Sequence, residues 1–77
     1  MNIDTMQNER TELTNKLKRL DIFFEKYIEE YDDKLQGSQE GNPYWKAYHE
    51  KYDEYILYEN RLKDLNRKIK ENILVNQ

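Results

Sequence analysis

Apolar side chains recur at spacings of three and four residues in both halves of the chain, with one gap of seven residues in each half. In the first half they are Ile3, Met6, Leu13, Leu17, Leu20, Phe24, Tyr27 and Tyr31. In the second half they are Tyr44, Tyr48, Tyr55, Tyr58, Leu62, Leu65 and Ile69. This heptad pattern is typical of helices that pack against a partner along one apolar stripe. The sequence therefore predicts two long α-helices.

One short segment interrupts the pattern. Gly37, Gly41 and Pro43 are the only glycines and the only proline in the chain. Gly37 suits the left-handed conformation that follows a helix, and Asn42-Pro43 places a capping residue before a proline at the first helical position. We predict helix one at about 4–36, a turn at 37–42 and helix two at about 43–75, in a single domain spanning 1–77. The expected fold is all-α, an antiparallel two-helix hairpin of coiled-coil type, able to pair into a four-helix bundle.

The predicted turn also predicts which residues face each other. If the turn is centred between residues 39 and 40, Tyr31 lies level with Tyr48, and Tyr27 with Tyr52. The interface between the helices is then aliphatic at the end with the chain termini and aromatic near the turn.

Several apolar side chains fall beside the predicted helix interface rather than in it. They are Ile28, Leu35, Trp45, Tyr52 and Ile56. On antiparallel helices these positions share one edge, so we expect an exposed apolar patch near the turn, a common sign of an interface. We expect this edge to bind a partner protein or a second copy of the chain as a homodimer.

Charge is distributed unevenly along the chain. The net charge of the 77 residues is −3, but residues 21–60 contain eleven acids against four bases, and the rest contains five acids against nine bases. The central block thus carries −7 and the remainder +4. All ten aromatic residues also lie in the acidic block, between Phe23 and Tyr58. Acids steer a protein towards a basic partner and aromatics anchor it, so we predict partner binding near the turn. The candidate partner-binding residues are Glu29, Asp33, Tyr44, Trp45, Glu50 and Asp53.

The sequence offers little catalytic or cofactor chemistry. The chain has no cysteine, and its one histidine, His49, falls on a solvent-facing position of the predicted helix. A bare hairpin gives its carboxylates no pocket that would shift their pKa values for acid–base catalysis. We therefore expect no enzymatic activity, no metal site and no cofactor.

Bulk properties restrict the expected partners and location. Because the chain is acidic overall, we expect no direct binding to nucleic acid. The chain lacks an apolar stretch of the roughly 20 residues that span a bilayer, and its start shows no signal peptide, so we expect a soluble, cytoplasmic protein without membrane contact.

Two local resemblances concern the start of helix two. The segment GNPYWKAYHEKYDEYI, residues 41–56, resembles the helical-hairpin aspartyl-phosphate phosphatases of sporulation control, whose second helix carries Ser-Gln-Glu-Leu-Asp. Asp53 matches the functional aspartate of that family, whereas residues 49–52 are His-Glu-Lys-Tyr. Trp45-Lys46-Ala47 is similar to the Trp-x-Gly turn of hairpins secreted by type VII systems, with alanine in place of glycine.

A third resemblance concerns the chain as a whole. Small, acidic, cysteine-free proteins rich in Lys, Asn, Ile and Tyr resemble inhibitors from phages and mobile elements, including anti-CRISPR proteins. Several of these present carboxylates in place of nucleic-acid phosphates to a basic groove, which implies a basic nucleic-acid-binding protein as partner. Our leading hypothesis is therefore a non-catalytic protein-binding module, an inhibitor or adaptor of this anti-defence type. The alternatives are a self-assembling structural hairpin and a regulator similar to the aspartyl-phosphate phosphatases.

Overall fold

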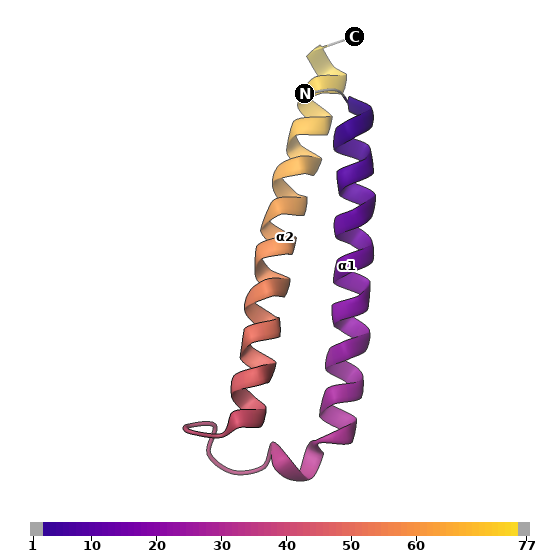
Figure 1. Ribbon diagram of the computed structural model, residues 1–77. Helices are drawn as coiled ribbons and strands as arrows, with labels where there is room; N and C mark the ends of the chain where they lie inside the picture. The colour runs from indigo at the N-terminus through magenta and orange to yellow at the C-terminus, as the bar shows by residue number, and fades with distance from the viewer. Residues whose placement is uncertain (1–2, 76–77) are drawn as a thin grey trace.

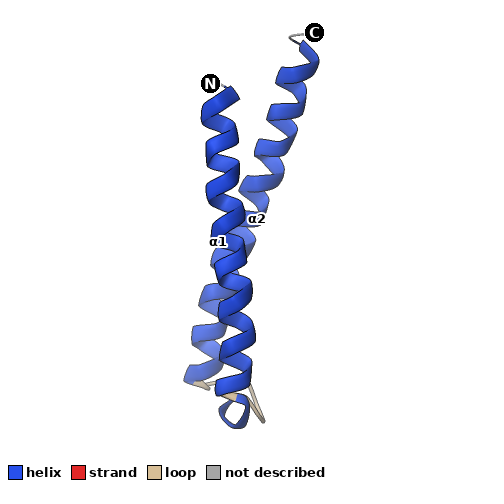
Figure 2. Cartoon of the chain, turned by 90° about the vertical axis from the view of Figure 1, so that its right-hand side faces the viewer, coloured by secondary structure: helices blue, strands red, loops and turns tan. Residues whose placement is uncertain are grey.

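The computed structural model describes residues 3–75 and, among their side chains, those up to Ile73. Helix α1 (Ile3–Glu30) is followed by a short 3-10 helix, η1 (Asp32–Lys34), and by helix α2 (Pro43–Val75). The two long helices run antiparallel, side by side, and form a rod of 55 × 20 × 14 Å (Figure 1). Seen from the side, they cross near the middle of the rod (Figure 2). The predicted all-α hairpin is confirmed. Within the described residues, neither helix combines the length and the apolar character needed to cross a bilayer.

Helix α1 ends earlier than the sequence pattern predicts. We predicted an end at about residue 36, but α1 stops at Glu30, and Tyr31 leaves the helical region with φ −112° and ψ 24°. The last turn of α1 contains no basic residue, and Asp32 and Asp33 follow it after one residue, Tyr31. Negative charges oppose the negative end of the helix dipole, and Asp is a poor helix former, so the helix stops before this cluster. The connection therefore spans residues 31–42 instead of 37–42.

Backbone and side-chain hydrogen bonds organise this connection. The Leu35 amide donates to the Tyr31 carbonyl at 3.0 Å, and Gly37 adopts the predicted left-handed conformation at φ 91°. The Asn42 side chain accepts from the Tyr44 amide and donates to the Lys34 carbonyl, both at 2.9 Å. The predicted cap of helix two at Asn42 is confirmed, and the same side chain also ties α2 to the end of η1.

The early end of α1 shifts the register of the hairpin. Because α1 ends at Glu30 and α2 starts at Pro43, the connection is centred between residues 36 and 37. The Tyr31 ring packs on Tyr44, with centroids 5.2 Å apart, and the Tyr27 ring on Tyr48 at 6.1 Å. The pairing predicted from the sequence, Tyr31 with Tyr48 and Tyr27 with Tyr52, is wrong by about one helical turn.

The buried core lies in the half of the rod away from the turn. Met6, Leu13, Leu65 and Ile69 form one buried cluster, and Leu65 has no exposed surface. Burial of apolar area at about 25 cal/mol per Å² is the main stabilising term available to two packed helices. The heptad pattern predicted the packing of these four residues correctly.

Candidate functional site

The turn-proximal half of the rod, residues 21–60, is packed with aromatic rings, none of which is fully buried. Nine of its ten aromatic side chains are half-buried, and Tyr52 is exposed. The rings touch across the helices: Phe24 lies 5.0 Å from Tyr48 and 6.0 Å from Tyr55 between centroids. Large side chains that stay partly exposed after folding leave apolar surface for a partner to cover.

The two aromatic residues predicted as anchors point to opposite edges of the rod. Tyr44 packs on Tyr31, whereas the Trp45 ring packs on His49, with centroids 5.7 Å apart. The Trp45 indole N–H donates to the Leu35 carbonyl at 2.8 Å. Successive helical residues are separated by about 100°, so the two side chains do not share a surface. Trp45 holds the connection in place, and Tyr44 faces the other edge.

Tyr44 belongs to an open groove between the helices. The groove is lined by Tyr27, Tyr31, Pro43, Tyr44 and Ala47, has a volume of about 340 Å³, and is called the tyrosine groove below. The Tyr27 hydroxyl donates to the Tyr44 carbonyl at 2.5 Å, which links its two walls. Sequence reasoning named Tyr44 but missed the other four residues. Ala47 was the available signal, because it is the one alanine in the chain and lies among much larger side chains.

The four acids predicted to bind a partner are all exposed. Glu29, Asp33, Glu50 and Asp53 form no ion pair with any described residue. They do not converge on one surface, however. Glu29 and Asp53 each lie two residues, about 200°, from a side chain that faces the other helix, so both lie on the outer faces of the rod. The predicted acids therefore surround the turn-proximal half instead of forming a compact site.

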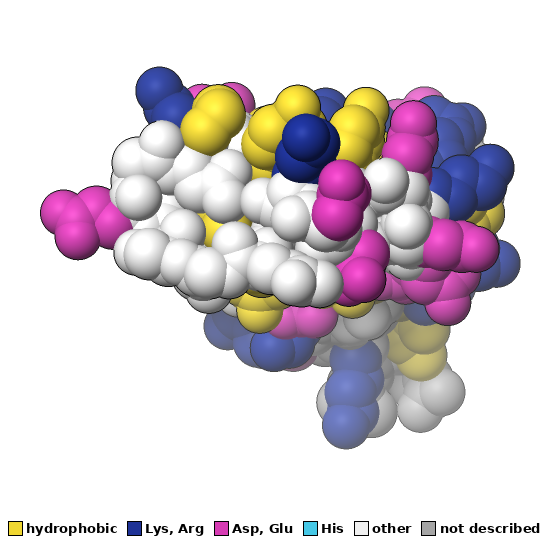
Figure 3. Space-filling view, turned by 90° about the horizontal axis from the view of Figure 1, so that it is seen from below, with side chains coloured by type: hydrophobic (Ala, Val, Ile, Leu, Met, Phe, Trp, Pro, Cys, Tyr) yellow, Lys and Arg dark blue, Asp and Glu magenta, His cyan; other side chains and the backbone are white. Residues whose placement is uncertain are grey.

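The predicted apolar edge is only partly present. Ile28, Tyr52 and Ile56 are exposed, at 44%, 45% and 36%. Leu35, predicted to join them, is 8% exposed, because the chain folds back after α1. The prediction was wrong for Leu35, which packs inside the connection. The view onto the turn end shows mostly uncharged groups over its tip, hydrophobic side chains along one edge and acids on more than one side (Figure 3).

The pKa values of Tyr27 and Tyr55 in this half are raised, so their hydroxyls stay protonated beyond the usual range. Burial, with the nearby Tyr31 and Tyr44, raises the pKa of Tyr27 above 10.0. Burial, followed by the charges of Asp21 and Glu59, raises the pKa of Tyr55 in the same way. At neutral pH these side chains are therefore neutral, and their rings keep the negative face that attracts cations.

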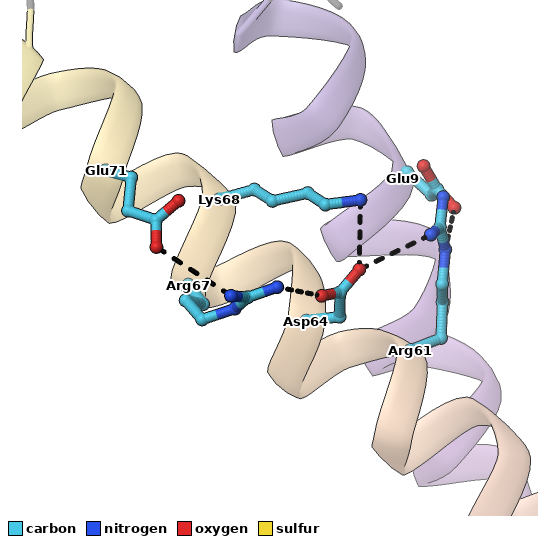
Figure 4. Close-up of polar contacts among 6 residues, drawn as sticks. All are labelled: Glu9, Arg61, Asp64, Arg67, Lys68 and Glu71. Carbon is cyan, nitrogen blue, oxygen red and sulfur yellow. Dashed lines mark hydrogen bonds and ion pairs between the residues drawn. The ribbon is translucent and has the colours of Figure 1, made fainter.

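In the terminal half of the rod, residues 3–20 and 61–73, charged side chains form ion pairs with one another. Arg61 Nε contacts Glu9 Oε1 at 2.8 Å across the helices, and Asp64 contacts Arg61, Arg67 and Lys68 (Figure 4). Hydrogen bonds from Arg67 and then Lys68 lower the pKa of Asp64. Three of the acids that lie here, Glu9, Asp64 and Glu71, thus pair with bases of the same chain.

The one histidine of the chain lies at the turn end of the rod, away from any grouped set of metal ligands in the part that the structure describes. His49 is exposed, stacks on Trp45 and has Nε2 3.1 Å from Gln39 Oε1. No three His, Asp or Glu side chains among the described residues are grouped so that they could hold a metal ion. Comparison with known proteins finds no matching family model, curated protein or solved structure.

Proposed function

We propose that the chain is a non-catalytic protein-binding module that engages a basic partner through its turn-proximal half. One observation carries the proposal: this half combines aromatic side chains that folding leaves partly exposed with acids that the chain's own bases do not neutralise. Its described acids form ion pairs only at Glu54, with Lys51 at 3.5 Å, and at Glu59, with Lys63 at 3.8 Å.

The two features serve different steps of binding. Unpaired acids distributed around the rod attract a positively charged partner over about a Debye length, roughly 8 Å at physiological salt, and mainly raise the association rate. Half-exposed tyrosines then give contact area at a small cost in side-chain entropy. A basic nucleic-acid-binding protein is the partner class that this surface suits, and blocking its basic groove would make the module an inhibitor of the anti-defence type.

Charge reversal tests the proposal. The partner is first identified by affinity capture and mass spectrometry from the native host, and its affinity is then measured by calorimetry. The variant carries Glu29→Lys, Asp33→Lys, Glu50→Lys and Asp53→Lys. We expect at least about a hundredfold loss of affinity at low salt, since each unscreened charge contact contributes on the order of 1 kcal/mol.

The matched control separates local charge from net charge. Glu50→Lys with Asp53→Lys changes the net charge as much as Glu12→Lys with Glu71→Lys in the terminal half. We expect the first pair to weaken binding and the second to leave it within about twofold. Equal effects of the two pairs, or an unchanged affinity of the fourfold variant at low salt, would rule out the proposed surface.

A second candidate function is self-assembly, favoured by the exposed edge of Ile28, Tyr52 and Ile56. Covering these side chains with the same edge of a second copy would bury apolar surface on both and close a four-helix bundle. Sedimentation of the wild-type chain decides, because a chain that remains monomeric at all concentrations cannot act in this way. The geometry gives no support of its own to the phosphatase-like alternative, since Asp53 lies on the outer face of α2.

A further inference from the structure

One edge of the rod carries a ladder of contacts between the helices. Its rungs start at Glu9, Lys16 and Phe23, which are spaced one heptad apart on α1. The rungs are Glu9 with Arg61 (Oε1 to Nε 2.8 Å), Lys16 with Tyr58 (Nζ to ring centroid 5.2 Å), and Phe23 with Lys51 (Nζ to ring centroid 6.0 Å). Every rung places a cation of this chain against a carboxylate or an aromatic face.

The next position in the heptad is Glu30, and here the chain supplies no cation. Glu30 is exposed and forms no ion pair with a described residue. Glu30 immediately precedes Tyr31, which lines the tyrosine groove; there the small side chain of Ala47 keeps about 340 Å³ open. The rings of Tyr27, Tyr31 and Tyr44 form its walls, and none of them has a cation over its face among the described residues. At this position the chain therefore supplies an acid and aromatic rings, but no cation to contact them.

We propose that the tyrosine groove binds the side chain of an arginine or lysine that the protein partner inserts. The proposal rests on the function proposed above and names the partner group that this site accepts. A cation is attracted to the negative face of an aromatic ring, and this attraction grows as the contact is desolvated. The hydroxyls of Tyr31 and Tyr44 donate to no described residue, so their oxygens can accept hydrogen bonds from the incoming group. Arginine fits best, because its planar guanidinium stacks on a ring and carries five donors.

The helix dipoles do not decide whether the groove prefers a cation or an anion. The groove lies between the C-terminal turn of α1, which carries partial negative charge, and the N-terminal turn of α2, which carries partial positive charge. The Asn42 side chain already caps the α2 terminus through the Tyr44 amide. With the two ends opposed, the tyrosine faces and the nearby Glu30 set the preference for a cation.

The competing occupant is an uncharged apolar or proline-rich segment, because aromatic grooves also bind such chains. Two probe peptides distinguish the occupants: a Gly/Ser peptide with two arginines, and the same peptide with two citrullines, which keep the shape of arginine without its charge. Each is titrated into the labelled protein and followed by NMR.

We expect the arginine peptide to shift the signals of Tyr27, Tyr31, Tyr44 and Ala47. The citrulline peptide should bind about five- to tenfold more weakly, in line with the strength of a partly desolvated cation–π contact. Ala47→Leu fills the groove without changing any charge or ring, and should weaken the arginine peptide to a similar extent. Tyr31→Leu, which removes one wall, is a second variant with the same expected effect.

The outcomes separate this proposal from the function on which it rests. Tyr52→Leu, on the opposite edge, should leave binding of the arginine peptide unchanged. Equal affinity for the two peptides, or unchanged binding to both the Ala47→Leu and the Tyr31→Leu proteins, overturns the groove proposal. If reversal of Glu29, Asp33, Glu50 and Asp53 still abolishes partner binding in that case, the proposed function stands without the groove. If that reversal has no effect either, both proposals fail.

Discussion

The two halves of this rod pack different kinds of side chain between the same two helices. The terminal half buries aliphatic residues such as Met6, Leu13 and Leu65, and most of its ion pairs join Glu9, Asp64 or Glu71 to bases across and along the helices. The turn-proximal half packs larger rings and buries none of them fully, and most of its acids have no ion-pair partner among the described residues. The buried core and the proposed binding surface thus lie at opposite ends of one pair of helices.

This separation has a physical reason. A two-helix hairpin buries only one stripe on each helix, so it has little apolar burial available for stability. Aliphatic side chains such as Leu13 and Leu65 fit within that stripe, whereas rings as large as tyrosine protrude from it. The half that leaves its rings partly exposed therefore depends on the buried core of the other half for stability.

The largest expected effect is the loss of Leu65 from the terminal core. Leu65 is 0% exposed and packs in the cluster with Met6, Leu13 and Ile69. Leu65→Ala should lower the free energy of unfolding by about 2–5 kcal/mol, because it removes buried methyl groups and leaves a cavity. Urea unfolding followed by circular dichroism measures the change. For so small a chain, this loss is a large part of the total stability.

The control is the same substitution in the turn-proximal half. Leu57 is 66% exposed on the same helix, so Leu57→Ala should change the free energy of unfolding by no more than about 0.5 kcal/mol. If the two variants lost similar stability, the distinction between a stabilising half and a binding half would be wrong.

The sequence predicted the regular parts of the molecule and missed those where local chemistry competes with the pattern. Heptad spacing placed Leu13 and Leu65 in the core, and Asn42-Pro43 marked the start of α2, because these features depend on near neighbours in the chain. The end of α1 was misplaced since Tyr31 and Leu35 continue the apolar spacing. Only the cluster of Asp32 and Asp33 at the negative end of the helix dipole indicated an earlier end.

The same error propagated to the candidate site. A connection starting at residue 31 moved the helices by about one turn relative to each other and buried Leu35. It also placed Tyr27 and Tyr31 opposite Tyr44 and Ala47, which makes the tyrosine groove. A groove depends on which side chains of two distant segments face each other, so a shift of a few residues is enough to hide it from sequence reasoning. Acids and aromatics, by contrast, could be assigned to the correct half without knowing the register.

An intermediate effect on stability is expected at Asn42. Here hydrogen bonds contribute stability that apolar burial provides in the terminal half. Asn42→Ala removes the cap on the Tyr44 amide and the bond to the Lys34 carbonyl. We expect a loss of about 1–2 kcal/mol in the free energy of unfolding, which urea unfolding can measure. Hydrogen exchange should show the loosening at residues 31–44 first.

Asn66→Ala is the matched control, because Asn66 is exposed within α2 and its side chain forms no hydrogen bond with a described residue. Its stability should stay close to that of the wild-type chain. A loss at Asn42 no greater than at Asn66 would mean that the connection is held by ring packing alone.

The smallest expected effect is a dependence on alkaline pH that belongs to the turn-proximal half. All seven tyrosines lie in that half, and the pKa of Tyr27 is raised above 10.0 by burial and by its tyrosine neighbours. A raised pKa means that the folded state holds the proton more tightly than the unfolded state. The stabilisation is therefore complete below about pH 10 and is lost as the pH rises through the folded-state value.

Lysine side chains titrate over the same range, so the wild-type chain alone cannot assign the effect. Comparison with Tyr27→Phe isolates it, because that variant keeps the ring and loses only the titrating hydroxyl and its bond to the Tyr44 carbonyl. Between about pH 9 and pH 11 the wild-type free energy of unfolding should fall more steeply than that of Tyr27→Phe. Parallel slopes would show that Tyr27 titrates alike in the folded and unfolded chains. The aromatic half would then be too open to shield even the tyrosine that bridges its two helices.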